Sequence, residues 1–151
     1  MSQNHDHAYG EEQFQAGNYE EALFAFSRAL LKEENTQFWN DWSTACWASG
    51  RIDLAEQGYR QALRLEPASV QSAANLGVLL SALGRFAEAV PMLAQSAEQL
   101  EGEQQAAVSQ LLGFCKAELA NAVRGIAQAP APAAGRQHRR INKVRTRRAK
   151  R

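Results

Sequence analysis

Few side chains in the sequence have the types and spacing that catalysis or metal binding requires. His5, Asp6 and His7 could bind a metal ion, but no cysteine or further histidine lies near them, so we interpret this segment as a frayed polar terminus. Cys46 and Cys115 lie on apolar faces of expected helices, which predicts buried structural thiols. Phosphate-binding glycine loops, dinucleotide-binding glycine motifs and nucleophile elbows are absent from the sequence. Because no pair of nucleophile and base stands out, we predict a non-enzyme without metal or cofactor.

The composition is that of a folded protein. Of the 151 residues, 45% are hydrophobic and 22% are charged, which excludes a fully disordered or collagen-like chain. No apolar run approaches the roughly 18 residues of a membrane span. The polar N-terminus has no apolar signal core, and two cysteines are too few for a disulfide framework. We therefore expect a reducing, cytoplasmic setting.

The charges are divided sharply along the chain. The formal net charge is +1, but residues 136–151 hold nine of the 17 basic residues and no acid. These nine are Arg136, Arg139, Arg140, Lys143, Arg145, Arg147, Arg148, Lys150 and Arg151. Residues 1–135 keep the other eight basic residues and all 16 acids, a net charge of −8. Since Pro130 and Pro132 block helix continuation, we predict an acidic domain over 1–127, a Pro/Ala linker over 128–135 and a flexible, disordered basic tail over 136–151.

Three segments of the acidic part repeat one pattern. Gly17, Gly50 and Gly84 lie 33 and 34 residues apart, and each is followed by a large apolar residue and then by an alanine. Apolar residues recur at three and four positions on either side, which is the spacing of an amphipathic helix. Two helices joined by a glycine turn form an αα-hairpin. Because one hairpin cannot bury its apolar faces alone, the hairpins must stack.

This pattern resembles the tetratricopeptide repeat (TPR). The second segment carries the family's positions best, through Trp39, Trp42, Ser43, Gly50, Ile52, Ala55, Tyr59, Ala62 and Pro67. The resemblance implies an all-α, right-handed superhelical stack of αα-hairpins, a TPR solenoid with seven helices. The repeats would span about 3–35, 36–69 and 70–102, and a capping helix with an apolar stripe from Val108 to Ile126 would follow over 103–126.

In this family the first helix of each repeat lines a concave groove, which here implies a partner-binding surface. By position, the groove would be lined by His7, Glu11, Phe14, Gln37, Asn40, Thr44, Trp47, Gln71, Ala74 and Val78. This set has no Lys or Arg, the residue types that some family members use to clamp a terminal carboxylate. Phe14 and Trp47 could anchor an apolar or aromatic segment of a partner, or they could pack between repeats.

Two functions of different classes fit these features. We predict an interaction module, a scaffold or adaptor that binds a peptide or helix of a partner protein in its groove, with the basic tail for electrostatic attachment. The alternative is a nucleic-acid-associated protein in which the Arg-rich tail is the functional element. A third hypothesis has the tail lie against the acidic body until a polyanion removes it. None of the three involves a small-molecule substrate.

The tail generates the first prediction. If roughly five of its charges meet phosphates of a DNA or RNA duplex, log K should fall against log salt with a slope of about −4.5, from −0.9 per contact. That slope corresponds to a several-hundredfold loss of affinity between ~50 and ~200 mM salt. Fluorescence anisotropy with a labelled oligonucleotide measures the slope, and deleting residues 136–151 should remove the binding. Salt-insensitive binding, or binding that survives the deletion, would contradict the prediction.

Overall fold

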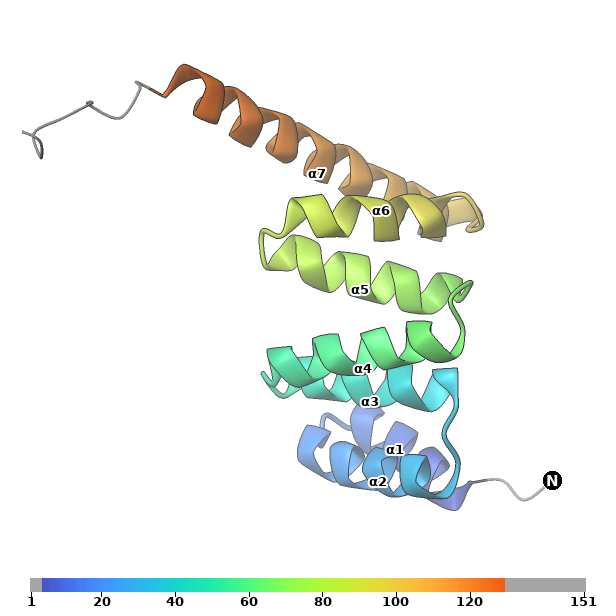
Figure 1. The fold of residues 1–151 in the computed structure, drawn as a ribbon. Helices are drawn as coiled ribbons and strands as arrows, with labels where there is room; N and C mark the ends of the chain where they lie inside the picture. Colours follow the sequence, from blue (N-terminus) through green and yellow to red (C-terminus); the bar gives the residue numbers. More distant parts are fainter. Residues whose placement is uncertain (1–3, 130–151) are drawn as a thin grey trace, which may run out of the picture. The chain divides into compact units, whose positions relative to one another are not determined.

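The computed structural model describes residues 4–129, and within them the chain forms seven α-helices and no strand (Figure 1). The helices are α1 (His5–Gln15), α2 (Tyr19–Lys32), α3 (Thr36–Ala48), α4 (Ile52–Leu65), α5 (Val70–Ala82), α6 (Phe86–Ala97) and α7 (Gly102–Gln128). The expected all-α fold is confirmed. The predicted basic tail over 136–151 and the linker from residue 130 lie outside the described residues.

The first six helices pair in chain order as three hairpins. α1 packs on α2, α3 on α4, and α5 on α6, and each hairpin contacts the next through α2 with α3 and α4 with α5. Each hairpin turns at a glycine with positive φ: 80° at Gly17, 82° at Gly50 and 72° at Gly84. At the first turn, Asn18 N donates to Gln13 O (2.9 Å) across the glycine. This hydrogen bond ends α1 at Gly17, and glycine adopts the left-handed backbone conformation needed there without steric cost.

Within each hairpin the two helices cross closely at a small residue. A methyl group added at Gly58 on α4 would lie 2.0 Å from Oγ of Ser43 and 2.9 Å from the ring of Trp42 on α3. A methyl group added at Gly10 would likewise overlap the ring of Phe26 in the first hairpin. One added at Gly77 would overlap the side chain of Leu93 in the third. Gly58 is therefore required by the α3–α4 crossing.

One continuous hydrophobic core runs through the stacked hairpins. Phe26, Tyr59, Leu76 and Leu93 are almost completely buried in it. Ala22, Ala55 and Ala89, the alanines of the repeated pattern, are fully buried and let neighbouring helices approach. The core therefore joins elements from all three repeats, as stacking requires.

The helix α7 continues this core over only part of its length. Val108 and Cys115 are buried in the core, and the ring of Phe114 meets that of Phe86 on α6 edge to face, with centroids 5.8 Å apart. The expected apolar stripe reaches Ile126, but every residue from Ala120 to Ala129, in a second compact unit, is exposed. Of this stripe, only residues before Ala120 are buried or half-buried.

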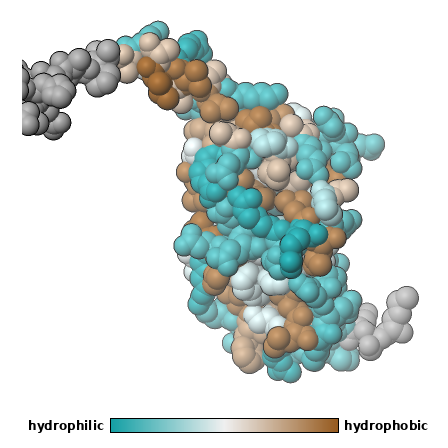
Figure 2. Space-filling view, viewed as in Figure 1, coloured by the Kyte–Doolittle hydropathy of each residue, from teal (hydrophilic) through white to brown (hydrophobic). Residues whose placement is uncertain are grey.

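Apolar side chains also reach the surface. Phe24 and Leu31 on α2 and Ile126 on α7 are strongly exposed, and apolar patches are visible near the α1–α2 end and along α7 in Figure 2. Among the described helices, none combines the length and apolar character needed to cross a membrane.

Replacing Gly58 with Ala should destabilise the fold, because the new methyl group overlaps Ser43 and Trp42. Overpacking of this kind typically costs ~1–3 kcal/mol, which denaturant-induced unfolding measures. Gly113→Ala in α7 is the matched control, since its methyl group would meet nothing within 4 Å. It should stabilise by up to ~1 kcal/mol through helix propensity. Equal unfolding free energies for the two variants would argue against the close crossing.

Candidate functional site

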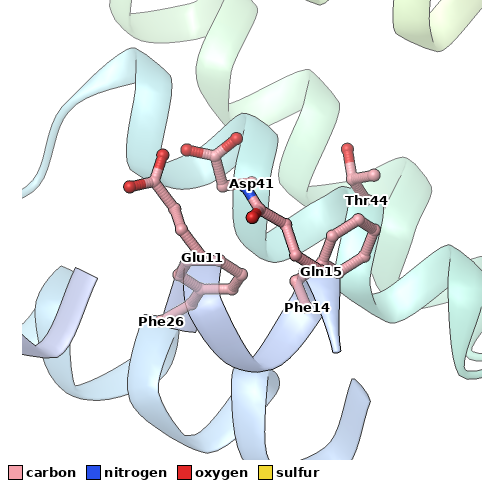
Figure 3. Close-up of a pocket in the computed structure, with 6 residues that line it drawn as sticks. All are labelled: Glu11, Phe14, Gln15, Phe26, Asp41 and Thr44. Carbon is pink, nitrogen blue, oxygen red and sulfur yellow. The ribbon is translucent and has the colours of Figure 1, made fainter. Parts of the chain in front are cut away.

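Two hollows lie along the first helices of the repeats. The first, of about 150 Å³, is lined by Glu11, Phe14 and Gln15 of α1, Phe26 of α2, and Asp41 and Thr44 of α3 (Figure 3). The second, of about 370 Å³, is lined by Thr36, Gln37, Asn40, Asp41, Glu66, Ser69 and Gln71. Asp41 lines both, so the two hollows meet at this residue. We call them together the groove.

The structure places six of the ten residues predicted for the binding surface in the walls of the groove. Glu11, Phe14 and Thr44 line the first hollow, and Gln37, Asn40 and Gln71 line the second. The other four, His7, Trp47, Ala74 and Val78, do not line either hollow.

The two aromatic residues of the expected surface differ in position. Trp47 is half-buried and packs against the hydrophobic core, as the packing alternative expects. Phe14 also packs against the core, but it keeps one side on the first hollow. Phe14 is therefore the aromatic side chain that a bound segment could contact.

Asp41 is one of six residues that line the groove but were not among the ten predicted; the others are Gln15, Phe26, Thr36, Glu66 and Ser69. Asp41 follows Gln37 by four residues and precedes Thr44 by three, so helical spacing places all three on one face of α3. This helical spacing is the sequence signal that places Asp41 on the same surface as Gln37 and Thr44. Figure 3 shows Glu11 and Gln15 rising from α1 toward Asp41 and Thr44 on α3.

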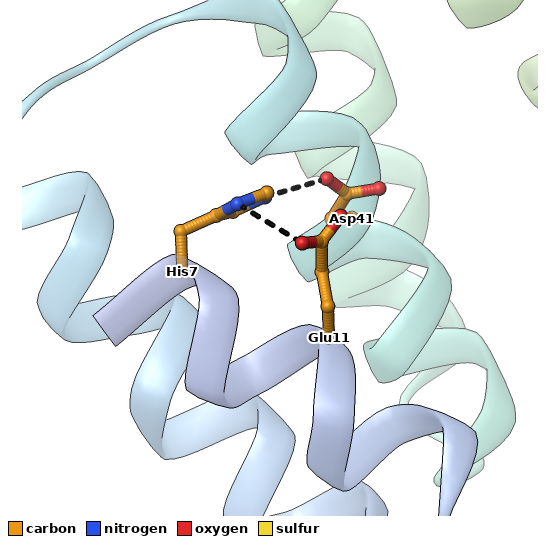
Figure 4. Close-up of side chains that lie close together, drawn as sticks. All are labelled: His7, Glu11 and Asp41. Atoms are coloured by element: carbon orange, nitrogen blue, oxygen red, sulfur yellow. Dashed lines mark hydrogen bonds and ion pairs between the residues drawn. The ribbon is translucent and has the colours of Figure 1, made fainter. Parts of the chain in front are cut away.

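His7 connects the two acids of the first hollow. Its Nε2 lies 2.8 Å from Oδ2 of Asp41 on α3, and its Nδ1 lies 3.7 Å from Oε2 of Glu11 on α1 (Figure 4). The ring is 8% exposed and stacks on Phe38 with 4.2 Å between centroids. The imidazole therefore links the first two hairpins from a buried position.

The interpretation of His5, Asp6 and His7 as a frayed terminus is wrong. All three belong to α1, and Asp6 pairs with Arg28 and Lys32 of α2. These ion pairs hold the first turn of α1 against α2. They also lower the pKa of Asp6, chiefly through its hydrogen bond with Lys32.

The carboxyl group of Asp41 is only partly exposed to water. Burial raises its pKa above the usual value, because desolvation disfavours the charged form. The hydrogen bond from His7 acts in the opposite direction, and the negative charge of Glu11 adds to the rise.

The cluster could supply ligands to a metal ion. One ring nitrogen of His7 and one carboxylate oxygen each of Glu11 and Asp41 lie within 4.8 Å of one another. However, the two ring nitrogens face different carboxylates (Figure 4), and an ion between them could use only one nitrogen. The observed arrangement is that of a hydrogen-bonded charge cluster.

Both cysteines are free thiols buried in the core. Cys46 is fully buried, and burial raises the pKa of its thiol to about 11. Burial also raises the pKa of Cys115. Because the thiolate is the reactive form, both side chains behave as small apolar groups of the core.

Residues 8–131 match the family described as the cilia and flagella-associated protein 70 middle TPR-like domain. The chain belongs to this TPR-like family. The match begins within α1 and covers the rest of the three hairpins and the described part of α7. It is consistent with the repeated glycine turns and the small residues at the hairpin crossings. The comparison with curated proteins gave no match.

Solved structures of TPR proteins share the fold. The type III secretion chaperone SycD of Yersinia enterocolitica, in complex with a peptide of the translocator YopD, is 21% identical with a TM-score of 0.70. It covers 76% of this chain and 92% of its own. The Sgt2 TPR domain from Aspergillus fumigatus is 19% identical with a TM-score of 0.69, covering 89% and 91%. The TPR2B domain of yeast Sti1, in complex with pHsp70, is 17% identical with a TM-score of 0.69, covering 76% and 95%.

Asp41→Asn should stabilise this TPR protein at neutral pH. A raised pKa means that the folded state binds the proton more tightly than the unfolded chain, so the wild type loses stability as the pH rises through the folded pKa. Asparagine removes the buried charge and can still accept the hydrogen bond from His7. Thermal unfolding at several pH values should show a higher midpoint for the variant at pH 7. The difference should vanish below the usual aspartate value of 3.8.

Glu12→Gln, at an exposed acid of the same helix as Glu11, is the control for that measurement. Its thermal unfolding midpoint should equal that of the wild type at each pH. A wild type that is more stable than Asp41→Asn at pH 7 would mean that Asp41 contributes more through His7 than its desolvation costs.

Proposed function

We propose that the chain is a non-enzymatic protein-interaction module, a scaffold or adaptor that binds a segment of a partner protein in its groove. The observation that carries the proposal is the groove itself, which is lined by side chains from consecutive repeats and is open to solvent. Membership of the TPR-like family supports it. So do the structures of SycD with a YopD peptide and of Sti1 with pHsp70, which have the same fold and hold peptides or partner segments.

The groove suits an extended peptide or one face of a helix. The first hollow offers Phe14 for an apolar contact beside the polar groups of Gln15 and Thr44. The second hollow is lined mainly by amide, hydroxyl and carboxylate groups, including those of Gln37 and Gln71. A bound segment could thus place one side chain in each hollow, with hydrogen bonds around an apolar anchor.

The Arg-rich tail supports the second candidate function, attachment to nucleic acid or another polyanion. Nine basic residues without an acid create a strong positive potential, and phosphate contacts made by such a segment carry little sequence information. The tail then adds electrostatic attachment to the interaction module, in a cytoplasmic setting without metal or cofactor.

A bulky substitution in the groove tests the interaction module. Gln37→Trp places an indole in the second hollow and should release groove-bound proteins in a pull-down analysed by mass spectrometry. Gln57→Trp, at an exposed glutamine of α4 that lines neither hollow, is the matched control. Deleting residues 136–151 should leave these partners bound and remove only those that need the tail. The same partners on Gln37→Trp as on the wild type would exclude the groove as their site.

A further inference from the structure

The groove helices are free of cationic side chains. No Lys or Arg occurs in α1, α3 or α5, whereas Glu11, Asp41 and Glu66 contribute carboxyl groups to the two hollows. The nearest group that can become positive is the imidazole of His7, which lies between Glu11 and Asp41. The groove therefore carries a local excess of negative charge.

Several Lys and Arg side chains of the helical domain form ion pairs away from the groove. Arg51 pairs with Glu20, and Arg60 and Arg85 pair with Glu56 and Glu88. Arg28 and Lys32 pair with Asp6. All of these cations lie on α2 or α4 or directly before α4 or α6, the second helices of their hairpins. Within residues 4–129, no Lys or Arg forms an ion pair with Glu11, Asp41 or Glu66.

The geometry of the acids fits a planar cation. One carboxylate oxygen of Glu11 and one of Asp41 lie within 4.8 Å of each other, and both side chains are partly exposed where they line the first hollow. A guanidinium group presents five N–H donors in a rigid fork and can donate to two carboxylates at once. Figure 3 shows the two carboxylates on facing helices at one edge of the hollow, with Phe14 and Thr44 farther along it.

A second acceptor lies next to Asp41. Asn40 is 6% exposed and lines the second hollow, and its Nδ2 donates to Oγ of Ser72 (2.9 Å). Its Oδ1 is buried and has no hydrogen-bond partner among the described residues. Buried acceptors without a donor are uncommon in folded proteins, so Asn40 is a polar side chain of the groove wall whose hydrogen-bonding capacity is not fully used.

We propose that the groove selects an arginine-bearing segment of a partner protein, whose guanidinium group binds the solvent-exposed sides of the Glu11 and Asp41 carboxyl groups while a neighbouring apolar side chain contacts Phe14. This inference rests on the proposed interaction module and names the chemistry of its partner. It also implies that an acidic or carboxylate-terminated peptide is rejected, because α1, α3 and α5 offer no Lys or Arg to pair with it. Selection then comes from repulsion as well as attraction.

Labelled synthetic peptides and the full-length chain test the proposal by fluorescence anisotropy. The probe is a blocked heptapeptide with a central arginine flanked by leucine and alanine. Its citrulline version removes the charge but keeps the shape, and its glutamate version reverses the charge. We expect the citrulline peptide to bind about tenfold to a hundredfold more weakly than the arginine peptide, and the glutamate peptide more weakly still.

Variants of the protein test where the guanidinium group of the peptide binds. Asp41→Asn should weaken the arginine peptide about tenfold to a hundredfold and leave the citrulline peptide nearly unchanged, which a double-mutant cycle expresses as coupling. Glu11→Lys changes an exposed side chain and should favour the glutamate peptide over the arginine peptide. Glu12→Gln, beside Glu11 but outside the groove lining, should bind all three peptides as the wild type does. Circular dichroism verifies that each variant is folded.

The outcomes separate this inference from the proposed function. Equal affinity for the arginine and citrulline peptides, no effect of Asp41→Asn, or no measurable binding of the arginine peptide overturns the cation site. If Gln37→Trp still releases a protein partner, the interaction module stands with a different ligand chemistry. If Gln37→Trp releases nothing and no peptide binds, both proposals fail.

Discussion

The close crossing of the two helices in each hairpin is the contact on which the rest of the structure depends. At Gly58 the backbone of α4 lies so near Ser43 and Trp42 of α3 that a single added methyl group would overlap them. Because small residues occupy the crossings, large side chains such as Tyr59 and Leu76 fill the space between neighbouring helices. The stacked hairpins then bring α1 and α3 together, and this contact creates the first hollow of the groove.

The Lys and Arg side chains are distributed unequally between the first and second helices of the hairpins. Ion pairs such as Glu20 with Arg51 and Glu56 with Arg85 join consecutive hairpins through their second helices. Exposed pairs of this kind contribute little stability individually, but they neutralise the acids they contact. The first helices contain no Lys or Arg, and within the described residues no Lys or Arg pairs with Glu11 or Asp41 at the groove. The charge selection that we propose for the groove follows from this placement of the Lys and Arg side chains.

At Asp41, stability conflicts with the binding that we propose. Its carboxyl group is partly buried, and burial raises its pKa, so the charged form opposes folding. A neutral residue at this position would favour the stack. Residues kept at a cost to stability are common at binding sites, where a partner supplies the missing contacts. The bond from His7 reduces this cost only in part, because desolvation is the larger effect.

The sequence alone was sufficient for the repeat architecture. The glycines at positions 17, 50 and 84, the alanines five residues after each of them and the helical apolar spacing specify hairpins through local conformation and periodicity. Six of the ten residues that the family resemblance assigns to the partner-binding surface also line the two hollows, since a face of a helix follows from the sequence register.

Only the tertiary structure decided the rest, because it depends on which helices meet. His7 and Asp41 are 34 residues apart, and their pairing arises from the contact of α1 with α3. The sequence predicted a frayed terminus where Asp6 and His7 each find partners on another helix. The exposure of Val123 and Ile126 likewise could not be inferred from spacing, because an apolar stripe is buried only where a neighbouring surface covers it.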